Sequence, residues 1–524
     1  MSGLFGTLGT ANSGMNTQQI GLETSSHNIA NANTPGYSRQ RAEMQANTPY
    51  TYTGIGQIGT GSKVSAITRA SDQFVLASIR KENALYNQYQ YKADVLGKME
   101  VIFNETPGQK SLSDDINAYF DAWSQLSNNP DSSTAKTIVV ENGNNLTDNM
   151  NHIAKELDSL RNETVSILEK NVMDFNAKLE ELNELNQQIF KASQDGSVPN
   201  DLLDRRDMIL EDLSGFGNIE TSFDEYGRAS VSLGGEKLVG PGEPVKTISV
   251  VVGVDENGQP IVSEGGNLTG ENITLENGES YPVGQLLISN PKDNPPVFSP
   301  IEVESGAAKG LQEGLVEIDK RTQEFNEFVF NFATAVNIIH SDNGKGADFF
   351  TLGDPNDPNF AMNIKVNEDI RNDHSLVNAG KEVRVPDPDN PGEYLPSEGA
   401  SGDGSRAAAM GKLADTRLGY PNAVFEYDPD TMTIKNEAGG STPHGAYVDI
   451  VTKNGIAKQQ ADNRVTSQEF LLFQLEDRKF ATSGVNINEE ITDVMRFQRA
   501  FQANARVITV VTDLLDTLIN RTGV

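Results

Sequence analysis

Apolar positions near the N-terminus recur in alternating steps of four and three residues, a spacing typical of a coiled-coil seam. Polar side chains, Gln18 and Ser25, occupy two of these positions. The segment also holds Gly9, Gly14 and Gly21, each of which weakens an isolated helix by ~1 kcal/mol relative to alanine. The pattern therefore predicts a helix that is not stable alone. Its apolar seam consists of Leu4, Leu8, Ala11, Met15, Leu22 and Ile29.

The C-terminus repeats this spacing with larger side chains. From Asn488 to Arg521 there is no glycine or proline, and at ~1.5 Å per residue this segment would form a rod of roughly 50 Å. We expect Asn488 to cap the helix, with Glu489 and Glu490 in the first turn, where the helix dipole favours acids. The two chain ends are expected to pack on each other or on copies of themselves. The seam positions are Ile487, Ile491, Val494, Gln498, Phe501, Ala505, Ile508, Thr512, Leu515 and Ile519, and Phe497, Val511, Leu514 and Leu518 widen the stripe.

Segments between the two ends show the same helical periodicity. Asp72 to Phe103 and Ala135 to Ala192 are predicted to be long helices, and "VPNDLLDRRDMILEDL" predicts a shorter helix capped at Asn200 or Asp201. A further helix follows from the four-three spacing of apolar residues between Leu311 and Ile339. These helices are expected to form a bundle.

Two other segments have the composition of strands and turns. Phe216 to Ser305 alternates short apolar runs, "ASVSLGG", "KTISVVVGV" and "GQLLIS", with glycine-rich turns, which predicts antiparallel strands. Ser341 to Lys453 is still richer in turn residues. The predicted fold is multidomain α+β, with paired terminal coiled-coil helices, a helical bundle built from discontinuous segments and two β-rich insertions. The predicted divisions are residues 1–33 with 485–524 (terminal helices), 34–70 (linker or hairpin), 71–215 with 306–340 and 454–484 (bundle), 216–305 (β-rich subdomain) and 341–453 (outer β-rich domain).

Composition narrows the possible functions. The 524 residues include 42 basic and 74 acidic side chains, a net charge of −32, which would repel nucleic acid and anionic lipid. The absence of cysteine excludes disulfides, thiolate metal sites and a cysteine nucleophile. No secretory signal or apolar run of membrane-spanning length is present. These rules alone indicate a cytosolic, soluble protein, unless the chain leaves the cell by a route without a cleaved signal.

The sequence offers only weak candidates for a catalytic or ligand-binding site. Gly54, Gly56 and Gly59 have dinucleotide-loop spacing, but no strand precedes them and no helix follows, so a hairpin or extended loop is expected. Acidic turns at 354–357 and 387–390 lack the ligand order of a calcium loop. No catalytic, cofactor or metal site is predicted, because the histidines are scattered. They are His27, His152, His340, His374 and His444.

The stretch "NIANANTPGYSRQ", residues 28–40, ends the N-terminal helix pattern. Asparagines weaken a helix, Pro35 pushes Thr34 toward extended geometry, and Gly36 can take positive φ. We expect it to redirect the chain, and packing of the terminal seams between subunits is favoured over a purely internal coil. The predicted assembly or export motif is Asn28, Asn31, Asn33, Thr34, Pro35, Gly36 and Tyr37. The predicted subunit-packing residues are Leu4, Leu8, Met15, Leu22, Ile29, Ile491, Val494, Phe497, Phe501, Ile508, Leu515 and Leu518.

These motifs resemble a known family. "NIANANTPGYSRQ" is similar to the N-terminal motif of the axial proteins of the bacterial flagellum, and the segment from Ser483 to Gly523 resembles their C-terminal helix. "NDLLDRRDMILEDL" and "GADFF" are most similar to the members that join hook to filament. The resemblance implies an inner tube of paired terminal helices, a surrounding helical bundle and outermost β-rich domains.

The resemblance also implies a function. The chain would be a structural adaptor ring at the hook-filament junction, required for filament assembly, and not an enzyme. Its implied partners are the hook protein, a neighbouring hook-associated junction protein, identical subunits and an export chaperone on the C-terminal helix. Export through the flagellar type III apparatus would place the chain outside the cell. The alternatives are another axial protein (hook or distal rod) or a secreted enzyme within the β-rich insertions.

Overall fold

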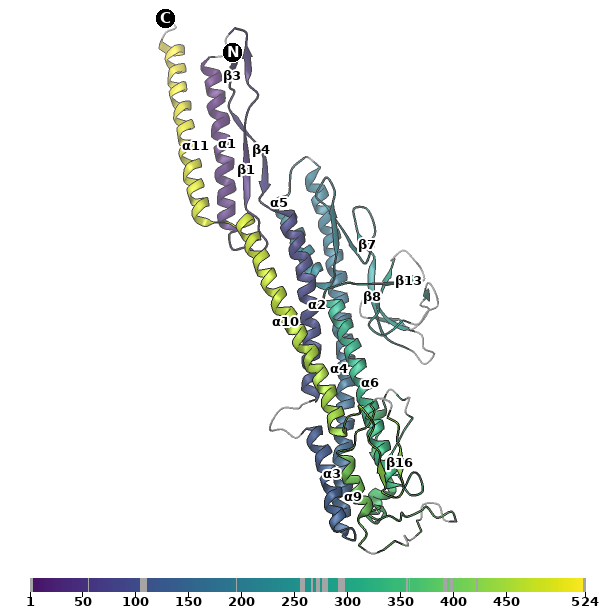
Figure 1. The fold of residues 1–524 in the computed structure, drawn as a ribbon. Coiled ribbons are helices and arrows are strands. Elements are labelled where there is room, and N and C mark those ends of the chain that lie inside the picture. The colour runs from purple at the N-terminus through teal and green to yellow at the C-terminus, as the bar shows by residue number, and fades with distance from the viewer. Residues whose placement is uncertain are drawn as a thin grey trace. The chain divides into compact units, whose positions relative to one another are not determined.

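A computed structural model describes most of the chain, and its helices and strands have the bounds given below (Figure 1). The described residues are 3–54, 56–103, 111–194, 196–254, 260–264, 267–269, 274–275, 281–290, 297–354, 357, 359–389, 394–395, 399–400, 402–420 and 423–521. The helices are α1 (Leu4–Ala30), α2 (Gln73–Phe103), α3 (Leu112–Asn128), α4 (Ser133–Ser193), α5 (Asn200–Phe216), α6 (Ala307–His340), α7 (Phe360–Asn363), α8 (Glu368–Asn372), η1 (His374–Leu376), α9 (Ser405–Leu413), α10 (Pro443–Ser483), α11 (Ile487–Asp516) and the π-helical η2 (Thr517–Arg521).

The strands form one six-stranded sheet, one three-stranded sheet and four two-stranded pairs within the described residues. All named strand pairs are antiparallel except β11 with β13. The strands are β1 (Gln40–Ala46), β2 (Tyr50–Tyr52), β3 (Gly56–Ile58), β4 (Ser62–Arg69), β5 (Glu220–Phe223), β6 (Ala229–Leu233), β7 (Glu236–Val239), β8 (Thr247–Val254), β9 (Pro260–Glu264), β10 (Asn267–Thr269), β11 (Thr274–Leu275), β12 (Leu286–Ser289), β13 (Val297–Ile301), β14 (Phe350–Thr351), β15 (Lys365–Val366), β16 (Tyr427–Asp428) and β17 (Thr433–Ile434).

The chain divides into two compact units, each built from discontinuous segments. The first unit comprises residues 1–88, 169–309 and 466–524, and the second comprises 89–168 and 310–465. The helices α2, α4, α6 and α10 each contribute residues to both units.

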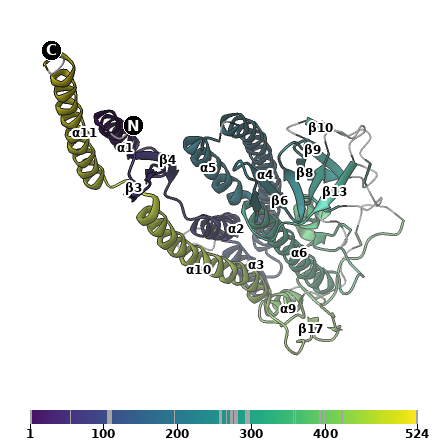
Figure 2. The same cartoon turned by 90° about the horizontal axis from the view of Figure 1, so that it is seen from above.

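The terminal helices pair within the first unit. α1 and α11 lie side by side and run in opposite directions, with both chain ends at the same end of the pair (Figures 1 and 2). The β1–β4 hairpin also packs on α1, so α1 has two neighbours. The expectation that the chain ends pack on each other is confirmed. The hairpin's contact with α1 was not foreseen.

Apolar seams build the core of the body of the first unit. The seam on the C-terminal part of α4 is buried along its length, and Phe175 stacks on Phe216 of α5 with ring centroids 4.2 Å apart. The six-stranded sheet (Figure 2) has its own cluster of buried side chains. That cluster contains Val251, Val262, Tyr281, Leu287 and Phe298.

An aromatic cluster forms the core of the second unit. Tyr119 and Trp123 of α3 make ring contacts with Phe332, Phe349 and Phe350. The helix α3 begins with a capping box between Ser111 and Asp114, a signal that our sequence analysis did not use.

Several sequence predictions need correction. Asn486, not Asn488, caps α11, since its side chain accepts from the Asn488 amide. Neither Asn200 nor Asp201 caps α5, because the N-cap position is Pro199, which makes no side-chain cap. The side chain of Asn200 instead donates to the Ile67 carbonyl. Residues 341–453 are poorer in strands than expected, since turn residues there are not separated by alternating apolar runs. Their described part holds two pairs of two-residue strands, short helices and the beginning of α10. The predicted boundary between residues 453 and 454 therefore lies within α10, which begins at Pro443.

Other predictions hold. The glycine segment after Tyr50 forms the β2–β3 hairpin, as expected. The long helices α2, α4 and α6 match their predicted ranges within two residues at most ends. The acidic turns at 354–357 and 387–390 lie partly outside the described residues, so their expected lack of a calcium site is not tested.

Candidate functional site

The joint after α1, residues 31–40, is the candidate functional site. α1 ends at Ala30, and successive turns follow, in which Thr34 N donates to Asn31 O at 2.9 Å and Tyr37 N donates to Thr34 O at 3.2 Å. Gly36 has φ 75°, a left-handed conformation that favours glycine. A Cβ at this position would also lie 2.1 Å from the sulfur of Met208 on α5. The turn therefore requires glycine for both its backbone and its packing.

Asn28 connects the joint to the strand that follows it. Its Oδ1 accepts from Tyr37 Oη at 2.7 Å and from the Gln40 amide at 2.9 Å. Its Nδ2 donates to Gln40 O at 2.9 Å and to Glu490 Oε2 at 3.1 Å. The amide of Asn28 is buried, so these four bonds satisfy a group that would otherwise be costly to desolvate.

Tyr37 acts as a neutral hydrogen-bond donor in this network. Its phenol oxygen lies 2.9 Å from Nδ1 of His27. Burial raises the pKa of Tyr37 well above its ordinary value of 10.0, and the negative charges of Asp201, Asp204 and Glu490 raise it further. The hydroxyl therefore keeps its proton at physiological pH.

Glu490 brings α11 into the joint. Its carboxylate is 1% exposed and accepts from Arg39 Nε at 2.6 Å. Arg39 also pairs with Glu489 at 3.0 Å and with Asp493 at 3.7 Å. The backbone amide of Arg39 donates to the carbonyl of Ser483, the last residue of α10, at 2.8 Å. Arg39 therefore ties the joint to the end of α10 and the beginning of α11.

The motif on α5 anchors the other side of the joint. Asp204 Oδ2 accepts from the Ser38 amide at 2.9 Å, and its Oδ1 accepts from Arg69 of β4 at 2.8 Å. Arg69 also pairs with Asp207 at 2.7 Å, and Gln40 donates to Asp201 at 2.8 Å. The acidic residues of "NDLLDRRD" therefore hold the hairpin and the joint against the bundle.

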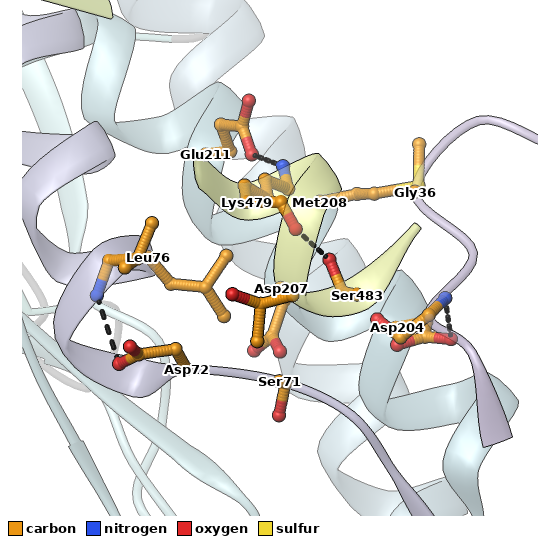
Figure 3. A pocket seen from close by; sticks show the side chains of 13 residues that line it. Gly36, Ser71, Asp72, Leu76, Asp204, Asp207, Met208, Glu211, Lys479 and Ser483 are labelled. Carbon is orange, nitrogen blue, oxygen red and sulfur yellow. Dashed lines mark hydrogen bonds and ion pairs between the residues drawn. The ribbon is translucent and has the colours of Figure 1, made fainter. Parts of the chain in front are cut away.

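A small pocket lies beside these contacts (Figure 3). Figure 3 shows the Met208 side chain reaching toward Gly36 and Lys479 of α10 paired with Glu211, an ion pair of 2.7 Å. The cavity volume is 20 Å³, about the space of a single water. This pocket beside Gly36 is too small for a substrate.

The predicted motif residues contribute unequally to the joint. Asn28 and Tyr37 form its centre, and the side chain of Asn31 donates to His27 O at 3.1 Å. Thr34 donates to Asn31, whereas Asn33 and Pro35 are exposed. The sequence analysis missed Arg39, Asp204, Asp207 and Met208, and it considered Glu490 only for the helix dipole. The alternating charges of "LLDRRD" were the available signal for the two aspartates.

The terminal seams are only partly covered. On α1, Leu4, Leu8, Met15, Leu22 and Ile29 are half-buried. On α11, Val494, Phe497, Phe501, Ile508 and Leu515 are half-buried, whereas Ile491 of α11 and Leu518 of η2 are exposed.

α1 approaches α11 most closely at small and polar residues that are spaced seven positions apart. A Cβ at Gly14 would lie 2.9 Å from Asn504, and one at Gly21 would lie 3.0 Å from Phe497. Asn28 bonds Glu490 one heptad further along. Gly14, Gly21 and Asn28 therefore form the line of closest approach to α11, and a seven-residue period of small residues was the signal that could have found it.

The described residues contain no group of three histidine, cysteine, aspartate or glutamate side chains placed to hold a metal ion. His340 is buried, and its Nδ1 donates to Ala347 O at 2.8 Å while its Nε2 accepts from the Asn378 amide. Thr137 lies 2.9 Å from His374 Nδ1. These histidines thus serve packing and hydrogen bonding within the second unit.

In the described part of the chain, no helix is both long and apolar enough to cross a membrane.

Family models match both chain ends and the helical middle. The model "Flagella basal body rod protein" matches residues 8–37, which are most of α1 and the joint, and "Flagellar basal body rod FlgEFG protein C-terminal" matches residues 480–521. The two paired chain ends and the joint are thus similar to those of flagellar axial proteins. "Flagellar hook-associated protein FlgK helical domain" matches residues 96–350. The three matches together cover more than half of the chain.

Relatives resemble the chain along its whole length. "Flagellar hook-associated protein 1" of Bacillus subtilis (strain 168) is 26% identical over 100% of this chain and 99% of its own. The proteins of that name from Salmonella typhimurium and Escherichia coli (strain K12) are 23% and 20% identical, over 97% and 98% of this chain and 98% and 99% of their own. The chain belongs to the flagellar hook-associated protein 1 family.

A solved structure has a similar fold. The flagellar hook junction protein FlgK from Burkholderia pseudomallei matches with a TM-score of 0.57 and 13% identity, over 78% of this chain and all of that chain. At this identity the match concerns the fold, and it agrees with the multidomain α+β class.

Proposed function

We propose that the chain is the structural subunit of an adaptor ring that joins the flagellar hook to the filament and is required for filament assembly. The observation that carries this proposal is the full-length similarity to flagellar hook-associated protein 1, together with family matches on both chain ends. The family is structural, and we infer that this chain catalyses no reaction.

The half-covered terminal helices support a role in assembly. Several large apolar side chains at the C-terminal end of the pair are exposed, including Val510 and Leu514 of α11 and Leu518 of η2. Exposed apolar stripes of this kind mark protein interfaces. We infer that identical subunits cover them in the ring, while the hook protein and a neighbouring hook-associated junction protein bind at its two ends.

The chain belongs to the bacterial flagellum as a member of its family. We infer that it reaches that place through the flagellar type III apparatus, without a cleaved signal, and lies outside the cell. An export chaperone would cover the amphipathic face of α11 before export. The predicted motif from Asn28 to Tyr37 and the terminal seam residues would then serve assembly in the exported chain.

Electron microscopy of a deletion strain tests the proposed function. Cells lacking the gene should carry hooks without filaments and release monomeric flagellin, and a plasmid copy should restore filaments. An epitope-tagged chain should label the hook-filament boundary. Filaments of normal number in the deletion strain would refute the proposal, and loss of the hooks as well would favour the hook or distal-rod alternative.

We further propose that the terminal coil becomes stable only on assembly. The three glycines of α1 weaken the helix, and the most buried side chains of α1 are small or polar, which gives little apolar burial. Circular dichroism and hydrogen exchange of the purified monomer should show residues 4–30 and 488–521 unprotected. Stable protection of both segments in the monomer would disprove this idea.

A further inference from the structure

The negative charge of the chain is distributed unevenly. Residues 1–72 and 466–524 hold 10 basic and 11 acidic side chains, a net charge of −1, and the rest of the chain therefore carries −31. Two copies of the acidic part repel each other at short range. The nearly neutral segments, which contain the terminal helices, the hairpin and the last part of α10, are where two copies can approach without that cost.

Exposed apolar side chains concentrate in one of these neutral segments. Of the 29 large apolar side chains that are exposed in the described residues, 12 lie between Phe470 and Ile519, about a tenth of the chain. Those on α11 belong to the terminal coil already discussed. The others lie on α10 and belong to no contact described so far.

Three phenylalanines form a stripe on α10. Phe470, Phe473 and Phe480 are 61%, 60% and 69% exposed. Their spacing of three and seven residues places them on one side of the helix, over about 15 Å of its length. We call these three residues the α10 stripe.

The opposite side of α10 already has its partners inside the first unit. Leu472 and Leu475 are half-buried there. Lys479 pairs with Glu211 of α5 at 2.7 Å. The α10 stripe therefore lies on the side of the helix opposite to these contacts.

We propose that the α10 stripe packs against a second copy of this chain in the assembled ring. This inference rests on the proposed function. If a phenylalanine presents about 200 Å², the stripe offers roughly 380 Å², less than half of the ~800 Å² per partner that a standard interface buries. The stripe is too small to recruit a partner alone, but it can extend a contact between molecules held together elsewhere.

The terminal helices supply that other contact. The stripe ends at Phe480, whose ring packs within 3 Å of the Cβ position of Gly484. α11 begins three residues later with Ile487 and Ile491, which are both exposed. A neighbouring copy that covers this face of α11 would be placed to cover the α10 stripe as well.

Photo-crosslinking tests the identity of the partner. Benzoylphenylalanine replaces Phe473 in the full-length chain, which is expressed in the deletion strain, and assembled flagella are irradiated. We expect a product of twice the chain mass that contains peptides of this chain alone. Crosslinks only to another protein would overturn the proposal. The absence of any crosslink from position 473 would also overturn it, provided that the same probe on the exposed face of α11 gives a product.

Substitution of the stripe tests its contribution. The triple change F470N, F473N and F480N should leave the thermal unfolding of the purified monomer within about 1 °C of the unmodified chain, because the side chains are already exposed. Flagella with filaments should become at least tenfold fewer. The matched control is Phe74→Asn, which changes another exposed phenylalanine, on α2, and should assemble normally.

The outcomes separate this inference from the proposed function. If the deletion strain lacks filaments but the triple variant assembles them at the normal frequency, only the α10 stripe proposal fails. A fall of several degrees in the melting temperature of the variant monomer would also overturn it, since the stripe would then pack within its own chain. Filaments in the deletion strain would refute the proposed function itself.

Discussion

The buried ion pairs of Arg69 allow a quantitative test of how the hairpin is held on the bundle. Arg69 is the last residue of β4, and its side chain is 8% exposed. It lies 2.8 Å from Asp204 and 2.7 Å from Asp207, whose side chains are 7% and 9% exposed. All three charges are therefore largely removed from water.

The substitution Arg69→Met keeps much of the side-chain volume but removes the positive charge. Asp204 would lose the arginine bonded to its Oδ1, whereas Asp207 would keep its ion pair with Arg206 at 2.6 Å. Removing one partner of a buried pair costs about 3 to 5 kcal/mol, since the remaining charge is left without compensation. At 1.4 kcal/mol for each factor of ten, local opening should become about two to three and a half orders of magnitude more frequent.

Hydrogen exchange measured by mass spectrometry reports this opening in peptides that cover β4 and α5. The control is Arg205→Met, which changes the neighbouring arginine of the same motif. Arg205 is 60% exposed and pairs with Glu181 at 2.8 Å, and an exposed pair contributes at most about 1 kcal/mol. Exchange in the control should rise no more than about fivefold. If the two variants exchanged at similar rates, the buried pairs would not be what holds the hairpin.

Three further predictions concern other parts of the chain. Phe501→Asp or Leu515→Asp should leave the central units folded by circular dichroism yet abolish incorporation at the hook tip, and normal swimming would contradict this. Tyr37→Phe removes one hydrogen bond to Asn28, so exchange in residues 28–40 of assembled flagella should rise about fivefold for a loss of ~1 kcal/mol; no change would show that the bond contributes nothing. Burial, with smaller contributions from the charges of Arg406 and Lys136, lowers the pKa of His340 from 6.5 to about 3. Below pH 6.5 this histidine is protonated in the unfolded chain but stays neutral in the folded chain. The free energy of unfolding of the second unit should therefore fall by about 1.4 kcal/mol for each pH unit below 6.5. Urea unfolding followed by Trp123 fluorescence at pH 7 and 5.5 should show this fall, and His340→Asn should lack it.

The elements with continuous apolar seams were predictable from the sequence. The seams of α4 and α6 are buried at almost every apolar position, because each helix packs one face along most of its length. The turn at Gly36 was predictable as well, since proline and glycine restrict the backbone locally. These predictions depend on neighbours within a few residues of each other.

The contacts of the joint were not predictable in this way. Arg39 and Glu490 are 451 positions apart, and nothing in the local pattern of either segment names the other as its partner. The helix caps failed for a related reason. Asn200 is a good capping residue by type, but its side chain bonds Ile67 O and so is not available to the helix. Tertiary contacts therefore overrode the local preference.

The glycines of α1 show how local weakness and tertiary packing are connected. In an isolated helix Gly14 and Gly21 are unfavourable, by ~1 kcal/mol each. In the folded chain a Cβ at either position would come within about 3 Å of Asn504 or Phe497 on α11, so a larger residue would push the two helices apart. The same residues that keep α1 from standing alone thus let it pack closely once α11 is present. Because that partner lies more than 450 positions away, the terminal pair can form only after the rest of the chain has brought its ends together. Late formation of the α1–α11 pair suits a subunit whose chain ends should become rigid only during assembly.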